Sequence, residues 1–150
     1  MSHRKGHLEG WLETALDCLL VKDVDGWVDH WAEDGRIEFP FAPGGYVSKV
    51  EGKPAIADYM AAFPSKFDFR RFEVLDAYSD PSGRYATVEF TCQATALETG
   101  RPYDQHYLAL LTFNADGKIL VYRDFWNPLV AIEALGDAQR LVRSRTEGGN

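Results

Sequence analysis

The chain has 150 residues and a net charge of −7, with 45% hydrophobic and 26% charged residues. This length is typical of one domain with a core large enough to enclose a pocket. The acidic balance argues against nucleic-acid binding, which needs a basic surface. The sequence has neither a signal-peptide pattern nor an apolar run long enough to cross a membrane. We therefore expect a soluble, cytoplasmic protein.

The first part of the chain is predicted to be mainly helical. Residues 7–22 place leucines, one alanine and a tryptophan at helical spacing. Asp23 is a plausible N-cap of a second helix that ends near residues 34–35. Residues 36–41 alternate like a strand, and a Pro- and Gly-rich loop follows over residues 42–49. A third helix is expected over residues 54–63, with Pro54 at its first position.

The second part is predicted to form strands that are joined by turns. The expected strands cover residues 67–80, 84–98, 102–115 and 118–126. A last short helix begins after Asn127-Pro128 and ends at Gly136. This order predicts an α+β fold, in which about three helices pack on a curved antiparallel sheet. We expect a single domain over residues 1–136 and a polar, frayed tail over residues 137–150.

Asp124 lies in the last predicted strand, and it is the residue that most needs an explanation. The period of a strand places it on the same face as Tyr122 and Trp126. Burial among aromatic rings would raise the pKa of a carboxyl group toward neutrality, where acid–base catalysis is most efficient. The alternative is a structural carboxylate that pairs with an arginine or reaches solvent.

His106 is a possible partner for Asp124. If the hairpins turn at residues 99–102 and 115–117, the even-numbered positions of the last three strands share one face. His106, Leu108, Phe90 and Cys92 would then line the same wall as Asp124. A slip of one residue in register would place His106 on the opposite face.

Several short motifs carry a family resemblance. These are TGRPY at residues 99–103, DGKI at 116–119, RDFWNP at 123–128 and ALG at 134–136. Together they resemble the SnoaL-like branch of the nuclear-transport-factor-two-like superfamily. The resemblance implies a cone-shaped fold with an internal pocket, and a homodimer through the outer face of the sheet. It also implies that Asp124, after Arg123, is the acid/base group.

Two departures narrow the chemistry that this resemblance implies. Phe39 stands where the ketosteroid isomerases carry their proton-shuttling aspartate. Phe90 and Cys92 stand where the epoxide hydrolase carries an arginine and a second aspartate. We therefore expect cofactor-independent acid/base chemistry by Asp124, assisted by His106: a cyclisation, isomerisation or condensation of an apolar cyclic or polyketide-like compound. The alternative is a non-catalytic binding protein.

The predicted site needs neither a metal nor a cofactor. Ligand pockets are mostly apolar and aromatic, so the lining is expected to come from large side chains of the helices and of the inner sheet face. The residues predicted to contact the ligand are Trp27, Trp31, Phe39, Tyr59, Phe63, Phe90, Cys92, Leu108, Tyr122 and Trp126.

Overall fold

A strongly curled sheet forms the main part of the protein. The computed structural model describes residues 14–135, which include seven strands. Their order in the sheet is β2-β1-β7-β6-β4-β3, and β5 pairs with β4. The strands are β1 (Trp31–Glu38), β2 (Lys49–Glu51), β3 (Phe67–Ser79), β4 (Tyr85–Ala96), β5 (Arg101–Pro102), β6 (His106–Phe113) and β7 (Ile119–Trp126).

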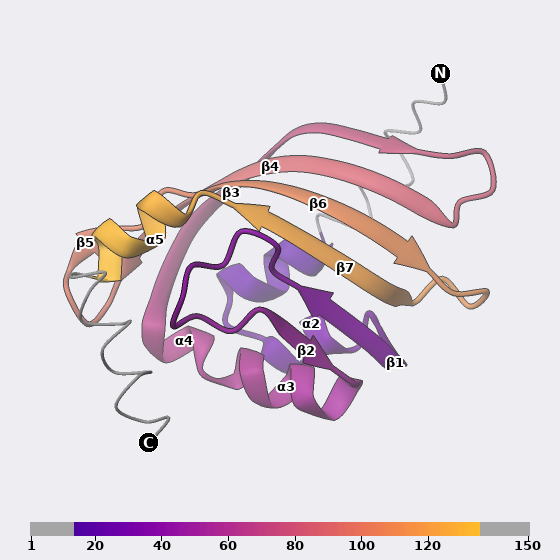
Figure 1. Ribbon diagram of the computed structural model, residues 1–150, viewed down its shortest axis with the longest axis horizontal. Helices are drawn as coiled ribbons and strands as arrows, with labels where there is room; N and C mark the ends of the chain where they lie inside the picture. Colours follow the sequence, from indigo (N-terminus) through magenta and orange to yellow (C-terminus); the bar gives the residue numbers. More distant parts are fainter. Residues whose placement is uncertain (1–13, 136–150) are drawn as a thin grey trace.

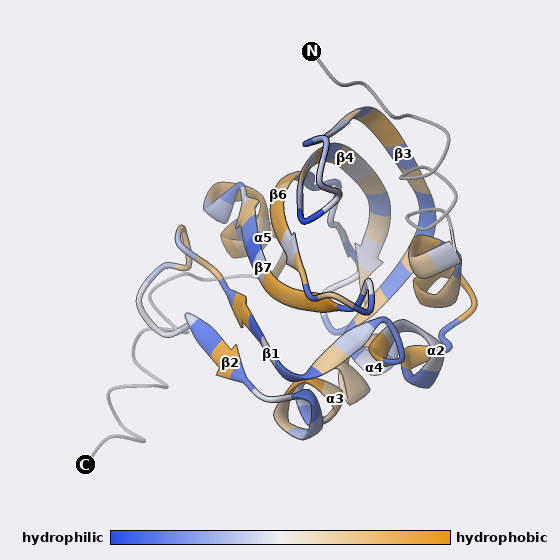
Figure 2. Ribbon diagram, turned by 90° about the vertical axis from the view of Figure 1, so that its right-hand side faces the viewer, coloured by the Kyte–Doolittle hydropathy of each residue, from blue (hydrophilic) through white to orange (hydrophobic). Residues whose placement is uncertain are grey.

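Helices cover the concave side and one end of this sheet. Residues 14–20 are helical, and they are followed by α2 (Val24–Val28), α3 (Lys53–Ala61), α4 (Phe63–Lys66) and α5 (Pro128–Leu135). Figure 1 shows α2, α3 and α4 beneath the sheet and α5 beside β5 at the far end. Figure 2 views the sheet nearly end-on, with its strands curling around an interior. The predicted α+β cone is confirmed.

Local sequence signals explain where α2 and α3 begin. Asp23 caps α2, because its Oδ1 accepts a hydrogen bond of 3.0 Å from the backbone N–H of Gly26. Pro54 lies in the first turn of α3, where its missing N–H costs nothing. Among residues 14–135, no helix is both long enough and apolar enough to cross a membrane.

Two predicted boundaries and the predicted direction of one strand pair differ from the structure. The second helix ends at Val28 instead of residues 34–35, since residues from Trp31 onward pair with β7 as a strand. The end of the predicted 42–49 loop belongs to β2, which pairs with β1. The sheet is mixed, because β1 and β7 run parallel. The predicted tail over residues 137–150 lies outside the described residues.

A β-bulge in β7 sets which side chains face the interior. Phe113 pairs with Ile119, but Thr112 pairs with Val121, so Leu120 is an extra residue on its strand. A bulge of this kind reverses the faces of the residues beyond it. As a result, Asp124 lies opposite Ala109 instead of an even-numbered residue of β6.

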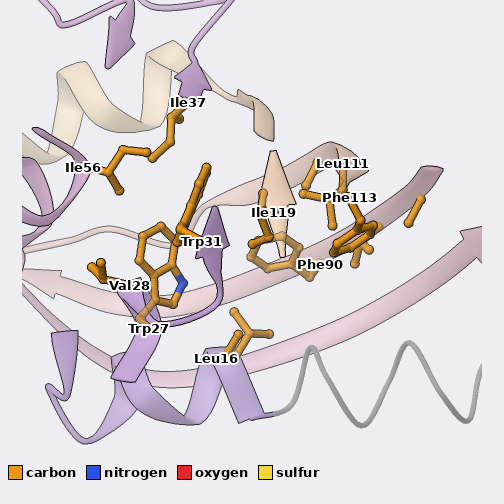
Figure 3. Close-up of a cluster of buried hydrophobic side chains, with 14 of the residues drawn as sticks. Leu16, Trp27, Val28, Trp31, Ile37, Ile56, Phe90, Leu111, Phe113 and Ile119 are labelled. Carbon is orange, nitrogen blue, oxygen red and sulfur yellow. The ribbon is translucent and has the colours of Figure 1, made fainter. Parts of the chain in front are cut away.

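The main core lies between the sheet and the helices. Trp27 and Trp31 lie side by side at its centre, with ring centroids 5.5 Å apart. Figure 3 shows Ile37 of β1 and Ile56 of α3 on one side of this pair. Phe90 and residues of β6 and β7 lie on the other side. This aromatic core fixes the inner face of the sheet, which carries the candidate site.

Candidate active site

A small cavity lies between the inner face of the sheet and the helices. It encloses about 70 Å³. Its lining is mostly apolar, and its polar groups are three tyrosine hydroxyls, one indole and one carboxyl group. The lining residues are Leu16, Leu19, Trp27, Ile37, Phe39, Tyr59, Met60, Phe63, Phe69, Phe72, Phe90, Tyr107, Tyr122 and Asp124.

Asp124 supplies the only carboxyl group of this lining in the part of the chain that the structure describes. The strand β7 holds it between β1 and β6. Its pairing partner on the adjacent strand β6 is Ala109, whose small side chain leaves space beside the carboxyl group. The Oδ1 atom of Asp124 is buried and has no hydrogen-bond partner within residues 14–135.

Burial changes the acidity of this carboxyl group. Removal from water disfavours the charged form and raises the pKa of Asp124 to about 7. A carboxyl group with this pKa can accept a proton and return it at neutral pH. No ion pair to Asp124 is found in the described chain; Arg123, the adjacent residue, pairs on the other face with Glu38 at 3.5 Å. The structural alternative of an arginine-bound carboxylate is therefore not observed.

Three tyrosines share the pocket with Asp124. Burial, reinforced by the charge of Asp124, raises the pKa of Tyr59 to about 12 and that of Tyr122 well above its ordinary value. The pKa of Tyr107 is also raised well above its ordinary value, mainly by burial. All three hydroxyls therefore stay protonated at neutral pH and can donate hydrogen bonds.

Six of the ten predicted ligand-contacting residues lie on this lining. They come from α2, the end of β1, α3, α4, β4 and β7, so segments far apart in the sequence meet at one cavity. These residues are Trp27, Phe39, Tyr59, Phe63, Phe90 and Tyr122.

The predicted pairing of His106 with Asp124 is wrong. His106 lies on the outer face of the sheet, where its Nε2 is 2.6 Å from Oε2 of Glu89. Leu108 also points outward and is 40% exposed. The cause is the register of β6, in which Tyr107 and Ala109, and not their even-numbered neighbours, pair with Trp126 and Asp124. His106 is therefore not available to a ligand in this cavity.

Three other predicted residues lie near the cavity but do not line it. Trp31 is fully buried in the core and stacks on Tyr122, with ring centroids 5.9 Å apart. Trp126 packs against Phe39 at 6.4 Å. Cys92 is buried in a second cluster, and its Sγ is 3.7 Å from the hydroxyl of Tyr107. These side chains support the lining from behind.

The sequence interpretation missed seven lining residues. Most are ordinary apolar positions of helices and strands, which carry no signal that separates a pocket from a core. Tyr107 differs, because it is an aromatic residue with a polar hydroxyl in a predicted strand. The assumed hairpin register, however, placed the odd-numbered residues of that strand on the outer face. The seven are Leu16, Leu19, Ile37, Met60, Phe69, Phe72 and Tyr107.

Comparison with known proteins agrees with this fold. Residues 12–122 match the model of the SnoaL-like domain family. The chain belongs to the SnoaL-like family. The SnoaL-like protein is 39% identical over 125 residues to YesE of Bacillus subtilis strain 168, covering 83% of this chain and 84% of the relative. It is 38% identical over 129 residues to the PhzA/B-like protein PA3332 of Pseudomonas aeruginosa, covering 86% of this chain and 90% of the relative. Both relatives are described as uncharacterized.

Solved structures show that the SnoaL-like protein shares its fold with several named proteins. A Bacillus subtilis protein provisionally named an isomerase is 37% identical and superposes with a TM-score of 0.80, covering 85% of this chain and 91% of that one. The phenazine-biosynthesis-related protein PhzB2 of Pseudomonas aeruginosa has a TM-score of 0.62 at 20% identity, covering 76% and 72%. At that identity, the second likeness concerns the fold alone.

Proposed function

We propose that this SnoaL-like protein catalyses cofactor-independent proton transfer on a small, neutral cyclic compound. The observation that carries the proposal is the Asp124 carboxyl group, which is buried in an apolar cavity with Oδ1 unpartnered within residues 14–135. Buried polar groups in folded proteins nearly always have a partner. An orphaned carboxyl oxygen in a cavity therefore indicates a partner that the ligand supplies.

The chemistry follows from the acidity of Asp124. In its ionised form, the carboxylate removes a proton from a carbon atom next to a carbonyl group, and the electron pair of that C–H bond moves into an enolate. The protonated carboxyl group then returns the proton, either to another carbon for an isomerisation or to oxygen after a ring closure. A pKa of about 7 suits both steps at neutral pH.

The size of the cavity limits the substrate. Its volume of about 70 Å³ is smaller than the ~150 Å³ of a cavity that holds benzene. A one-ring compound fits after small movements of the lining, whereas a polyketide-sized compound needs a larger opening. Several aromatic side chains of the lining, Phe69 and Phe72 among them, are only partly buried, so small movements of these rings can widen the cavity.

The names of the relatives support the same class of reaction. One relative of similar sequence carries the name of an isomerase, and another is called PhzA/B-like. An isomerisation that passes through an enolate requires removing and returning a proton, which one carboxyl group of suitable pKa can do.

The test is deuterium exchange of small cyclic ketones in D₂O, followed by proton NMR. We expect the wild-type protein to exchange the hydrogens next to the carbonyl group of at least one ketone. Asp124→Asn should reduce this exchange at least about 100-fold, the usual contribution of a positioned acid/base group. Asp58→Asn, which changes an exposed carboxylate of α3, is the matched control. An Asp124→Asn variant with full exchange would contradict the proposal.

A second candidate is a binding protein that leaves its ligand unchanged. It is favoured by the absence of a second group that titrates near neutral pH on the lining within residues 14–135. In that case, both the wild-type protein and Asp124→Asn should bind the ketone and return it without deuterium.

A further inference from the structure

Two tyrosine hydroxyls in the cavity lack partners. Tyr59 and Tyr122 make no side-chain hydrogen bond to any group within residues 14–135, although both line the cavity. Tyr107 differs, because its hydroxyl contacts Sγ of Cys92 at 3.7 Å. Neither the Tyr59 nor the Tyr122 hydroxyl is among the fully buried polar atoms that lack a partner. Both therefore reach accessible space and are available to donate hydrogen bonds to polar atoms of a ligand.

Packing fixes the rings that carry these hydroxyls. Tyr122 stacks on Trp31 with an interplanar angle of 24°. Tyr59 packs between Phe39 and Phe63, with ring centroids 5.6 Å and 5.4 Å away. One tyrosine therefore projects from β7 and the other from α3, and both positions are set by neighbouring aromatic rings.

Asp124 lines the same cavity as both tyrosines. Tyr122 is two residues from Asp124 on the same face of β7. The charge of Asp124 also acts on Tyr59 across the cavity. Because the cavity encloses only about 70 Å³, a single small ligand can reach all three groups.

Charge decides which ligand fits this arrangement. No arginine, lysine or histidine lines the cavity in the described part of the chain. A carboxylate or phosphate ligand would meet the charge of Asp124 without a compensating cation, which is unfavourable in an apolar cavity. A neutral oxygen that accepts hydrogen bonds meets two donors and no repulsion.

We propose that Tyr59 and Tyr122 donate hydrogen bonds to one carbonyl oxygen of the ligand, while Asp124 faces the carbon next to it. The pair selects cyclic ketones over hydrocarbons of the same shape and over carboxylates. The assignment of Asp124 rests on the function proposed above; the donor pair does not, since a binding protein would use it in the same way.

The experiment compares three probes by ligand-observed NMR titration: cyclohexanone, methylenecyclohexane and cyclohexanecarboxylate. Methylenecyclohexane has the shape of the ketone but no oxygen. We expect cyclohexanone to bind most tightly and cyclohexanecarboxylate most weakly. Tyr122→Phe and Tyr59→Phe should each weaken cyclohexanone binding about three- to tenfold, as expected for one lost hydrogen bond. Neither variant should weaken methylenecyclohexane binding.

Tyr85→Phe is the matched control, because Tyr85 is on the outer face and is 58% exposed. The thermal unfolding of all three variants should stay close to that of the wild type, since no hydrogen bond of the described chain is removed. Unchanged cyclohexanone affinity in both cavity variants would overturn the donor pair. Equal losses for the ketone and the hydrocarbon would also overturn it, because the rings and not the hydroxyls would then account for the effect.

Failure of this inference differs measurably from failure of the proposed function. If exchange depends on Asp124 but not on the tyrosines, the proposed enzymatic function is supported and the donor pair is wrong. If ketone binding depends on the tyrosines but no exchange occurs, the donor pair is supported and the proposed enzymatic function is wrong.

Discussion

The burial of Asp124 links the candidate site to the stability of the protein. Its folded-state pKa of about 7 lies above the ~3.9 of an unfolded aspartate. Below about pH 4 the carboxyl group is protonated in both states and has no effect on stability. Between about pH 4 and 7 the unfolded state releases the proton first, so the free energy of unfolding falls as the pH rises. Above pH 7 the full cost applies, which is at most about 4 kcal/mol.

Asp124→Asn should therefore stabilise the protein in a pH-dependent way. The variant should unfold at a higher temperature or urea concentration than the wild type at pH 8.5, and at nearly the same point at pH 4. Urea denaturation at several pH values measures the difference. A gain that is equal at both pH values would show that Asp124 is not buried as a carboxyl group. Asp58→Asn should show no such trend, because Asp58 is exposed.

At this scale the sequence predicted the position of Asp124 on the inner face of the sheet but failed for that of His106. The alternation of β7 and the acidic residue after Arg123 are local signals, and both survive in the structure. The position of His106 depends on two hairpin registers. Across the turn after β4, Ala96 pairs with Arg101, so an even-numbered residue faces an odd-numbered one. The prediction assumed that even-numbered residues pair with each other. The bulge at Leu120 then adds a second reversal. The two register errors cancel between β4 and β7, so the even-numbered residues of both strands face the interior as predicted. In β6, which lies between them, the odd-numbered residues face the interior instead.

Among the elements, β1 controls the packing behind the pocket. It pairs with β7 at Trp31 and again at Arg36, with an irregular stretch between. Gly35 lies in this stretch. A Cβ atom added there would be 2.8 Å from Cε3 of Trp31 and 3.0 Å from the carbonyl oxygen of Ile119. Glycine is needed at this position because the backbone and the indole ring approach so closely.

Gly35→Ala should lower the free energy of unfolding by about 1–3 kcal/mol, the usual cost of overpacking a core. It should also disturb the stacking of Trp31 on Tyr122, so near-ultraviolet circular dichroism should change. Gly44→Ala is the control, since an added Cβ there meets nothing within 4 Å. Equal stability of the two variants would contradict the close approach at Gly35.

The element order was predictable from periodicity and turn signals, but the start of β1 was not. Val24, Trp27, Val28 and Trp31 have helical spacing, so residues 31–35 were expected to continue the helix. The pairing partner of Trp31 is Ile119, which lies far along the chain. Long-range pairing of this kind overrides a local pattern, and no local signal shows it.

At the scale of the whole molecule, no helix or loop of residues 14–135 covers the outer face of the sheet. It carries the exposed side chains of Tyr85 (58%), Leu108 (40%) and Tyr78 (37%). Beside them lies a broad hollow lined in part by Leu110, Val121 and Arg123. The dimer that the resemblance implies would use this face, and we keep a second copy of the chain as the proposed partner.

Leu108→Glu tests this dimer, because it places a charge at an exposed apolar position of the face. The variant should shift the protein toward monomer in sedimentation velocity at micromolar concentration. Val21→Glu, which changes a 74% exposed residue away from the sheet, should leave the association unchanged. A wild-type protein that is monomeric under the same conditions, or a variant that stays dimeric, would contradict the prediction.

The parallel pair of β1 and β7 also governs how the protein can be made. Because β7 lies between β1 and β6, residue 37 must meet residue 122 before the sheet is continuous. During synthesis, β1 leaves the ribosome early and keeps one open edge until nearly the whole domain has emerged. Such non-local topology favours slow folding and exposes an unpaired strand to other chains. The strand that carries Asp124 is therefore also the last piece of the sheet, so a chain cut short before it would lack both the carboxyl group and the protection of its own edge.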